Sequence, residues 1–213
     1  MELVAKEIKK KIQNKTILDS IHLQLYGGNV YGFTGANGSG KTMLFRALSG
    51  LISLDSGTIT FDGEILRKDI SVLPSLGIIL ENVHLYPELT GYQNLEYLAG
   101  LKNQIGKEEI VNALERVGLD PKDRRTYKKY SFGMKQRLAI AQAIMEKPDV
   151  LMLDEPTNAL DQDGILRIRN IIIDEKERGA MILLASHNLN ELAILADHIY
   201  EMQDGKIVRE RVR

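Results

Sequence analysis

The chain has 213 residues, and 44% of them are hydrophobic, which is enough to form a buried core. Its 28 basic and 29 acidic side chains give a formal charge of −1, so a nucleic acid is not expected as a partner. Cysteine is absent, which excludes disulfides and thiolate metal sites, and no apolar run reaches the roughly 18 residues that a membrane-spanning helix needs.

The first part of the chain is predicted to be mainly β-structure. Residues 2–8 and 21–26 are rich in β-forming side chains and flank a polar turn at 13–15, which predicts antiparallel strands. Further along, residues 57–63 have the pattern of a short strand between turns, and 77–80 that of a buried strand.

The middle of the chain has a different pattern. From residue 90 to about 147 the apolar side chains recur at helical spacing, which predicts a helical insertion. Strand patterns return at 150–153 and 181–184, with a polar-faced helix predicted between them at 162–178. Strands that alternate with helices indicate a parallel sheet with helices on both faces.

A phosphate-binding loop is predicted at residues 35–42. The sequence there matches G-x-x-x-x-G-K-[ST] and lies between an apolar, strand-like segment and a helix that ends near residue 50. Glycines let successive N–H groups turn toward phosphate oxygens, Lys41 supplies a charge for the β- and γ-phosphates, and Thr42 offers a hydroxyl group to Mg²⁺. The candidate nucleotide-binding residues are Gly35, Asn37, Gly38, Ser39, Gly40, Lys41 and Thr42.

Two adjacent carboxylates follow the strand predicted at 150–153. Asp154 and Glu155 would lie at the carboxyl end of a buried strand, where ligands of open α/β sheets bind. We assign Asp154 to the metal ion and Glu155 to the general base, because attack on the γ-phosphate needs an acceptor near the attacking water. The simpler interpretation, an acidic turn at a strand end, is less favoured beside a phosphate-binding loop.

With these motifs, the chain resembles the ATP-binding cassette (ABC) family over essentially its whole length. Residues 158–161 are similar to the D-loop of the family, which ends at Asp161, and His187 is similar to its switch histidine. The stretch 130–137, Tyr-Ser-Phe-Gly-Met-Lys-Gln-Arg, takes the place of the signature motif L-S-G-G-Q. Ser131 is predicted to cap the helix that runs to Met145, and Gly133 to leave room for a backbone N–H to meet a phosphate.

The resemblance implies the fold and the way the sites are completed. It implies a RecA-like phosphate-loop NTPase core with a parallel sheet, an N-terminal antiparallel β subdomain and an inserted helical subdomain. In a single cassette domain of residues 1–213, we expect 1–88 and 148–213 to form the nucleotide-binding lobe and about 89–147 the helical one. Ser131 and Gly133 are then expected to contact ATP bound to a second cassette, in a head-to-tail homodimer or heterodimer, and His187 to contact the γ-phosphate.

The sequence departs from the family pattern at four positions. Phe132 and Met134 replace a glycine and the glutamine of the signature, which is expected to weaken the sandwich without abolishing it. Glu81 stands where the family has its Q-loop glutamine; a carboxylate can still ligate Mg²⁺, and we expect Glu81 to sense the metal. Ile12 aligns with the aromatic residue that often stacks on adenine, so base discrimination is expected to be poor.

The implied function is an ATP-binding and ATP-hydrolysing subunit that drives a separate membrane permease as the two cassettes close and reopen. The motifs are similar to those of multidrug and bacitracin-resistance-type exporters, which implies a place on the cytoplasmic face of the membrane. Two alternatives remain open. One is a soluble cassette ATPase that acts on nucleic acid, and the other is a nucleotide-dependent switch with little turnover.

Overall fold

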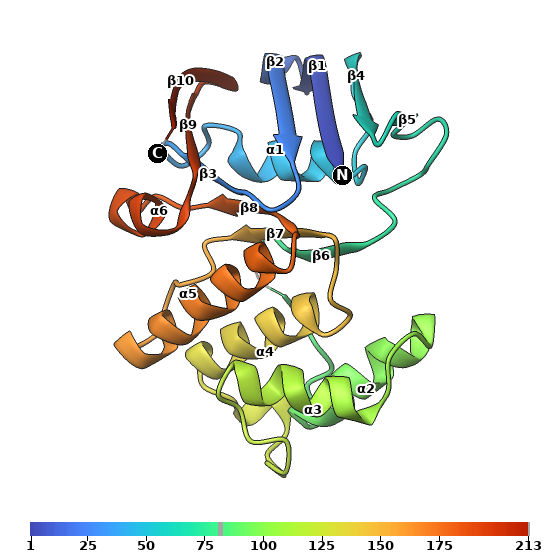
Figure 1. Cartoon of the computed structure of the whole chain (residues 1–213), viewed down its shortest axis with the longest axis vertical. Helices are drawn as coiled ribbons and strands as arrows, with labels where there is room; N and C mark the ends of the chain where they lie inside the picture. Colours follow the sequence, from blue (N-terminus) through green and yellow to red (C-terminus); the bar gives the residue numbers. More distant parts are fainter. Residues whose placement is uncertain (81–82, 213) are drawn as a thin grey trace.

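The computed structural model describes residues 1–80 and 83–212. In this part of the chain two β-sheets lie on either side of helix α1, and a group of helices packs on the far side of the larger sheet (Figure 1). The sequence predicts an α/β protein with an antiparallel β subdomain and a mainly parallel sheet. The structure confirms this architecture.

The smaller sheet is antiparallel and has the strand order β2-β1-β4-β5. Its first hairpin turns at Gln13 and Asn14, which both adopt left-handed backbone conformations, as a tight two-residue hairpin loop requires. The turn lies where the sequence predicts it, although both flanking strands are longer than expected. The strands are β1 (Glu2–Ile12), β2 (Lys15–Tyr26), β4 (Ser56–Phe61) and β5 (Glu64–Ile65).

The larger sheet has the strand order β10-β9-β3-β8-β7-β6. All neighbouring pairs in it are parallel except β9 with β10, which is antiparallel. The hairpin of β9 and β10 and the short helix α6 before it were not predicted from the sequence. The strands are β3 (Val30–Thr34), β6 (Leu76–Ile79), β7 (Val150–Asp154), β8 (Met181–Ala185), β9 (His198–Gln203) and β10 (Lys206–Val212).

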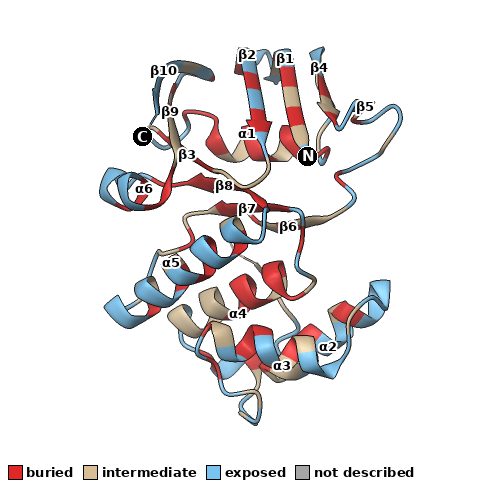
Figure 2. Ribbon diagram, in the orientation of Figure 1, coloured by how far each residue is buried: buried red, intermediate tan, exposed pale blue. Residues whose placement is uncertain are grey.

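Alternating side chains of the larger sheet form two hydrophobic cores. On β7, Leu151 and Leu153 join the core on the side of the helices, whereas Val150 and Met152 join the core around α1. Side chains of β8 alternate in the same way. Figure 2 shows β7 and β8 as almost continuously buried, which explains why both strands have unbroken apolar sequences.

The helices divide between the two faces of the larger sheet. Helix α1 (Lys41–Leu48) lies between the sheets, and α2, α3 and α4 pack together on the opposite side, where α4 lies against β6 and α5 against β8 (Figure 1). Among the described residues, no helix is both long and apolar enough to cross a bilayer. The boundaries of a helical subdomain at residues 89 and 147 stay a prediction. The remaining helices are α2 (Gly91–Lys102), α3 (Lys107–Arg116), α4 (Phe132–Ile144), α5 (Gln162–Glu177), α6 (Leu189–Leu195) and the 3-10 turn Tyr127–Lys129.

A buried ionic contact joins this group of helices to α5. The carboxylate of Glu175 accepts hydrogen bonds from Nη1 of Arg116, at 2.7 Å, and from Nε of Arg178, at 2.8 Å. Only 2% of Glu175 is exposed. Arg116 is the last residue of α3, so its guanidinium group ties α3 to the last turn of α5.

Candidate active site

A cavity of about 590 Å³ opens at the carboxyl ends of β3 and β7. It brings the predicted phosphate-binding loop together with both predicted carboxylates, although they lie more than 100 residues apart in the chain. The lining residues are Lys15, Ile17, Asn37, Gly38, Gly40, Lys41, Thr42, Met43, Phe132, Gln136, Asp154, Glu155 and Asn158.

The loop between β3 and α1 needs glycine at two positions. Gly35 has φ of 148°, and a Cβ atom there would lie 2.2 Å from the carbonyl oxygen of Met202. At Gly40, which has φ of 109°, a Cβ atom would lie 2.9 Å from the carbonyl oxygen of Ile17. The loop therefore depends on glycine for both its backbone angles and its close packing against neighbouring strands.

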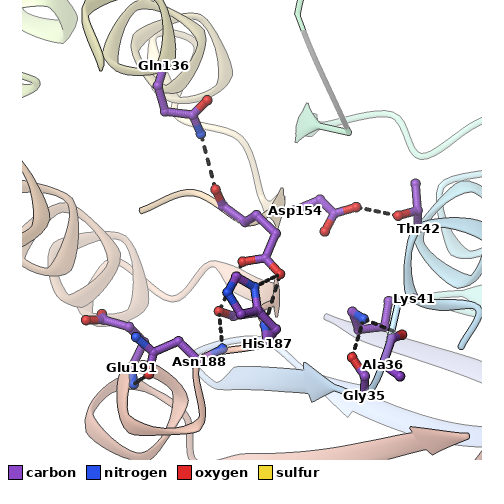
Figure 3. Close-up of polar contacts among 11 residues, drawn as sticks. Gly35, Ala36, Lys41, Thr42, Gln136, Asp154, His187, Asn188 and Glu191 are labelled. Carbon is purple, nitrogen blue, oxygen red and sulfur yellow. Dashed lines mark hydrogen bonds and ion pairs between the residues drawn. The ribbon is translucent and has the colours of Figure 1, made fainter. Parts of the chain in front are cut away.

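The environment of Lys41 fits a phosphate group. Its ammonium group donates to the carbonyl oxygens of Gly35, at 2.7 Å, and Ala36, at 3.2 Å, and only 8% of the residue is exposed (Figure 3). Both acceptors are neutral, so a phosphate would add the negative charge that a buried ammonium group favours. Among the described residues, the buried Oγ of Ser39 in the same loop has no hydrogen-bond partner.

Thr42 and Asp154 meet at the predicted metal site. The Thr42 hydroxyl group donates to Oδ2 of Asp154 at 2.5 Å, which joins the start of α1 to the end of β7 (Figure 3). Hydroxyl and carboxylate oxygens are ligands that Mg²⁺ accepts, so these residues fit the predicted ion. Glu81, the third predicted ligand, lies outside the described residues.

Glu155 and His187 are in direct contact. Oε1 of Glu155 lies 2.7 Å from Nδ1 of His187 and accepts from the backbone N–H of His187 at 2.9 Å, while Oε2 accepts from the Ser186 hydroxyl group at 3.3 Å. Both partners follow β8, and the backbone N–H of Glu155 donates to the last residue of that strand, Ala185, at 2.8 Å. Neighbouring strands thus place the predicted base beside the predicted switch histidine.

Gln136 contributes a contact that was not predicted. Its side-chain amide donates to the backbone carbonyl oxygen of Glu155 at 3.4 Å (Figure 3) and to that of Pro156 at 3.2 Å. The residue lies within the quoted signature stretch, but the sequence does not show which way its side chain points. That direction depends on how α4 packs against the segment that follows β7.

The signature segment has the predicted helix cap. Oγ of Ser131 accepts from the backbone N–H of Met134 at 3.2 Å, which confirms Ser131 as the N-cap of α4. Gly133 packs closely against another loop, because a Cβ atom there would lie 3.0 Å from the carbonyl oxygen of Ala159. Phe132 is 60% exposed and reaches the cavity.

Other predicted ligand residues do not line the cavity. The described residues that line it do not include Gly35, Ser39, Ser131, Gly133, Asp161 or His187. The carboxylate of Asp161 instead accepts from the backbone N–H of Gly164 at 2.8 Å and caps α5.

The position that the resemblance assigns to adenine stacking lies at the tip of the first hairpin. Ile12 is 43% exposed and pairs with Lys15 at the end of the first hairpin, and it is not among the residues that line the cavity. Lys15 and Ile17 line the cavity instead. The effect of Ile12 on base recognition stays a prediction.

Comparisons with known proteins agree with this site. Residues 18–158 match the model of the family described as "ABC transporter". An uncharacterized ABC transporter ATP-binding protein of Bacillus subtilis, YybJ, is 46% identical over 200 residues, which cover 94% of this chain and 92% of that protein. The lantibiotic transport ATP-binding protein SrtF of Streptococcus pyogenes is 39% identical, over 98% of this chain and 90% of SrtF.

Further matches extend the comparison to a longer relative and to solved structures. The bacitracin transport ATP-binding protein BcrA of Enterococcus faecalis is 40% identical over 95% of this chain and 67% of BcrA. The dimeric structure of MJ0796, a bacterial ABC transporter cassette, superposes with a TM-score of 0.88 over 99% of this chain and 98% of that chain, at 23% identity, and so supports the fold. The family match and these relatives, together with the phosphate-binding loop and the paired carboxylates, show that the chain belongs to the ABC transporter family and is an ATP-binding, ATP-hydrolysing subunit.

Proposed function

We propose that this subunit powers the export of a peptide antibiotic through a separate membrane permease. Support comes from two relatives at about 40% identity, which are named for lantibiotic transport and bacitracin transport. With no membrane-spanning helix among its described residues, the subunit would deliver its work to the permease from the cytoplasmic face of the membrane. The permease would dock near residue 81 and on the helical subdomain, residues 89–147.

The residues of the cavity have separate roles in ATP hydrolysis. Lys41 and the amides of its loop bind the phosphates, and Thr42 and Asp154 hold Mg²⁺, which when bound neutralises charge on the phosphate oxygens. Glu155 accepts the proton of the attacking water, and His187 holds the Glu155 carboxylate in place. One observation carries this assignment: the Glu155 carboxylate, bonded by His187 and Ser186, shares a cavity with Lys41 and Thr42.

A second cassette would complete the site. Ser131 caps a helix whose N-terminus favours an anion, yet it does not line the cavity of its own chain. A head-to-tail partner would bring its own Ser131 and Gly133 to the bound ATP, and the related MJ0796 cassette is described as dimeric. In such a pair, nucleotide binding closes the dimer and hydrolysis reopens it.

The test compares Glu155→Gln with Glu177→Gln, a change at an exposed glutamate of α5. Loss of a general base should lower the turnover of Glu155→Gln by about 100-fold or more, while ATP still binds. Light scattering with ATP and Mg²⁺ should then show a dimer for Glu155→Gln and a return to monomer when ATP is removed. Wild-type turnover in Glu155→Gln, or a monomer under all conditions, would refute the proposal.

The transport role needs its own measurement. The tagged subunit should co-purify from membranes with a multi-span protein, and deletion of the subunit should make the cell more sensitive to a peptide antibiotic. Complementation with Glu155→Gln should fail, whereas Glu177→Gln should restore resistance. Full resistance in the Glu155→Gln strain would contradict an ATP-driven exporter.

A further inference from the structure

We propose that Gln136 is a positioning residue for ATP hydrolysis, because its amide holds the backbone that carries Glu155. The proposal rests on the role of Glu155 as the base, set out above. Gln136 donates to the carbonyl oxygens of Glu155 and Pro156 from the second turn of α4. It lines the same cavity as Glu155 and Lys41.

The chemistry of these two contacts is unambiguous. Both acceptors are backbone carbonyl oxygens, which cannot donate, so the NH₂ group of the Gln136 amide must face them. The Glu155 carbonyl also accepts from the backbone N–H of Asn158 at 3.2 Å, which a carbonyl oxygen with two lone pairs allows. A side chain of the same shape without N–H donors could not make either bond.

The backbone of Glu155 needs such support. Its φ of 50° lies in the left-handed region, which residues other than glycine rarely adopt and which persists only where the surroundings hold it. On one side, the N–H of Glu155 is tied to Ala185 of β8. On the other side, the Gln136 side chain donates to the carbonyl oxygen of Glu155 and so links it to α4. Hydrogen bonds to β8 and to α4 therefore hold the Glu155 backbone at both ends.

A second contact extends the link between α4 and this segment. Gly133, one turn before Gln136, packs against the carbonyl oxygen of Ala159, which also has a left-handed backbone with φ of 61°. The start of α4 therefore lies along residues 155–159. Since Ser131 caps the same helix, a shift of α4 when a second cassette binds would reach the Glu155 backbone through Gln136.

The experiment uses Gln136→Ala and Gln136→Glu, with Gln142→Ala on the same helix as the matched control. Loss of two neutral hydrogen bonds should lower kcat about tenfold in Gln136→Ala, with KM for ATP unchanged. Gln136→Glu should lose more, because a carboxylate of the same shape presents acceptors to two carbonyl oxygens. Gln142→Ala should keep the wild-type kcat.

The Glu155→Gln background separates this inference from the proposed function. If Gln136 acts through Glu155, Gln136→Ala should change the single-turnover rate of Glu155→Gln by less than about twofold. Normal turnover in Glu155→Gln itself would overturn the role of the base. Loss of turnover in Glu155→Gln but wild-type kcat in both Gln136 variants would overturn only the role of Gln136. A loss in Gln136→Ala that appears as a raised KM would also overturn it.

Discussion

Replacing Arg116 with methionine should destabilise the protein, because it breaks the buried contact between α3 and α5. The Arg116 side chain is 23% exposed, whereas that of Glu175 is only 3% exposed. A methionine keeps an unbranched, apolar stem but removes the donor that lies 2.7 Å from the Glu175 carboxylate. Glu175 would then keep Arg178 as its cationic partner.

The structure sets the size of the effect. Removal of one partner from a buried ion pair typically costs about 3–5 kcal/mol. Because Arg178 remains bonded to Glu175, we expect a smaller loss, about 2 kcal/mol in the free energy of unfolding. For a chain of this size about 1 kcal/mol lowers Tm by roughly 2–4 °C, so Tm should fall by about 4–8 °C.

Thermal unfolding followed by circular dichroism measures this change. Arg124→Met, at an exposed arginine before α4, is the control and should change the free energy of unfolding by no more than about 0.5 kcal/mol. Adding Glu175→Gln to Arg116→Met should recover part of the loss, because the buried charge is then removed. Equal Tm values for Arg116→Met and Arg124→Met would refute the reasoning.

Three further substitutions test other contacts. The fully buried Asn94 bonds both the backbone N–H and the carbonyl of Tyr86, so Asn94→Ala should cost about 2–3 kcal/mol, and an unchanged urea midpoint would contradict this. Asp161→Ala removes the cap of α5 and should cost about 1 kcal/mol, which a Tm equal to that of the wild type would exclude. Burial raises the pKa of Asp197, but hydrogen bonds from Lys176 and a backbone N–H outweigh it and hold that pKa below its ordinary 3.8. Such a carboxylate stabilises the fold above pH 4, and this contribution disappears as pH falls through the lowered pKa. Asp197→Asn should therefore lower the free energy of unfolding at pH 7 by more than it does below pH 3.8. Urea unfolding of the variant and the wild type at pH 7 and below pH 3.8 checks this difference.

Local chemistry made much of the fold predictable. The turn after β1 was located because polar residues separate two runs of β-forming side chains, and β7 and β8 were found because strands buried on both faces are continuously apolar. The cap at Ser131 was also predictable, since its partner lies three residues away. The last hairpin, β9 and β10, was missed; its outer strand is largely exposed and alternates weakly.

The site was predictable only in part. Lys41 and Thr42 follow from a motif whose chemistry is contained in neighbouring residues. That Lys15 and Ile17 line the cavity was not predicted, because the register of the hairpin decides which arm faces the cavity. The bond from Gln136 to the backbone of Glu155 was missed for a related reason, since it joins two elements.

The sequence by itself determined the phosphate-binding loop, the change from strands to a helical insertion and back to β7 and β8, and the carboxylates at the end of β7, because each depends on residues close together in the chain. Only the tertiary structure decided that His187 bonds Glu155, that Gln136 bonds the Glu155 backbone and that Ser131 does not line the cavity of its own chain. These contacts depend on how β7, β8 and α4 pack, and packing is set by the whole core, not by a local pattern.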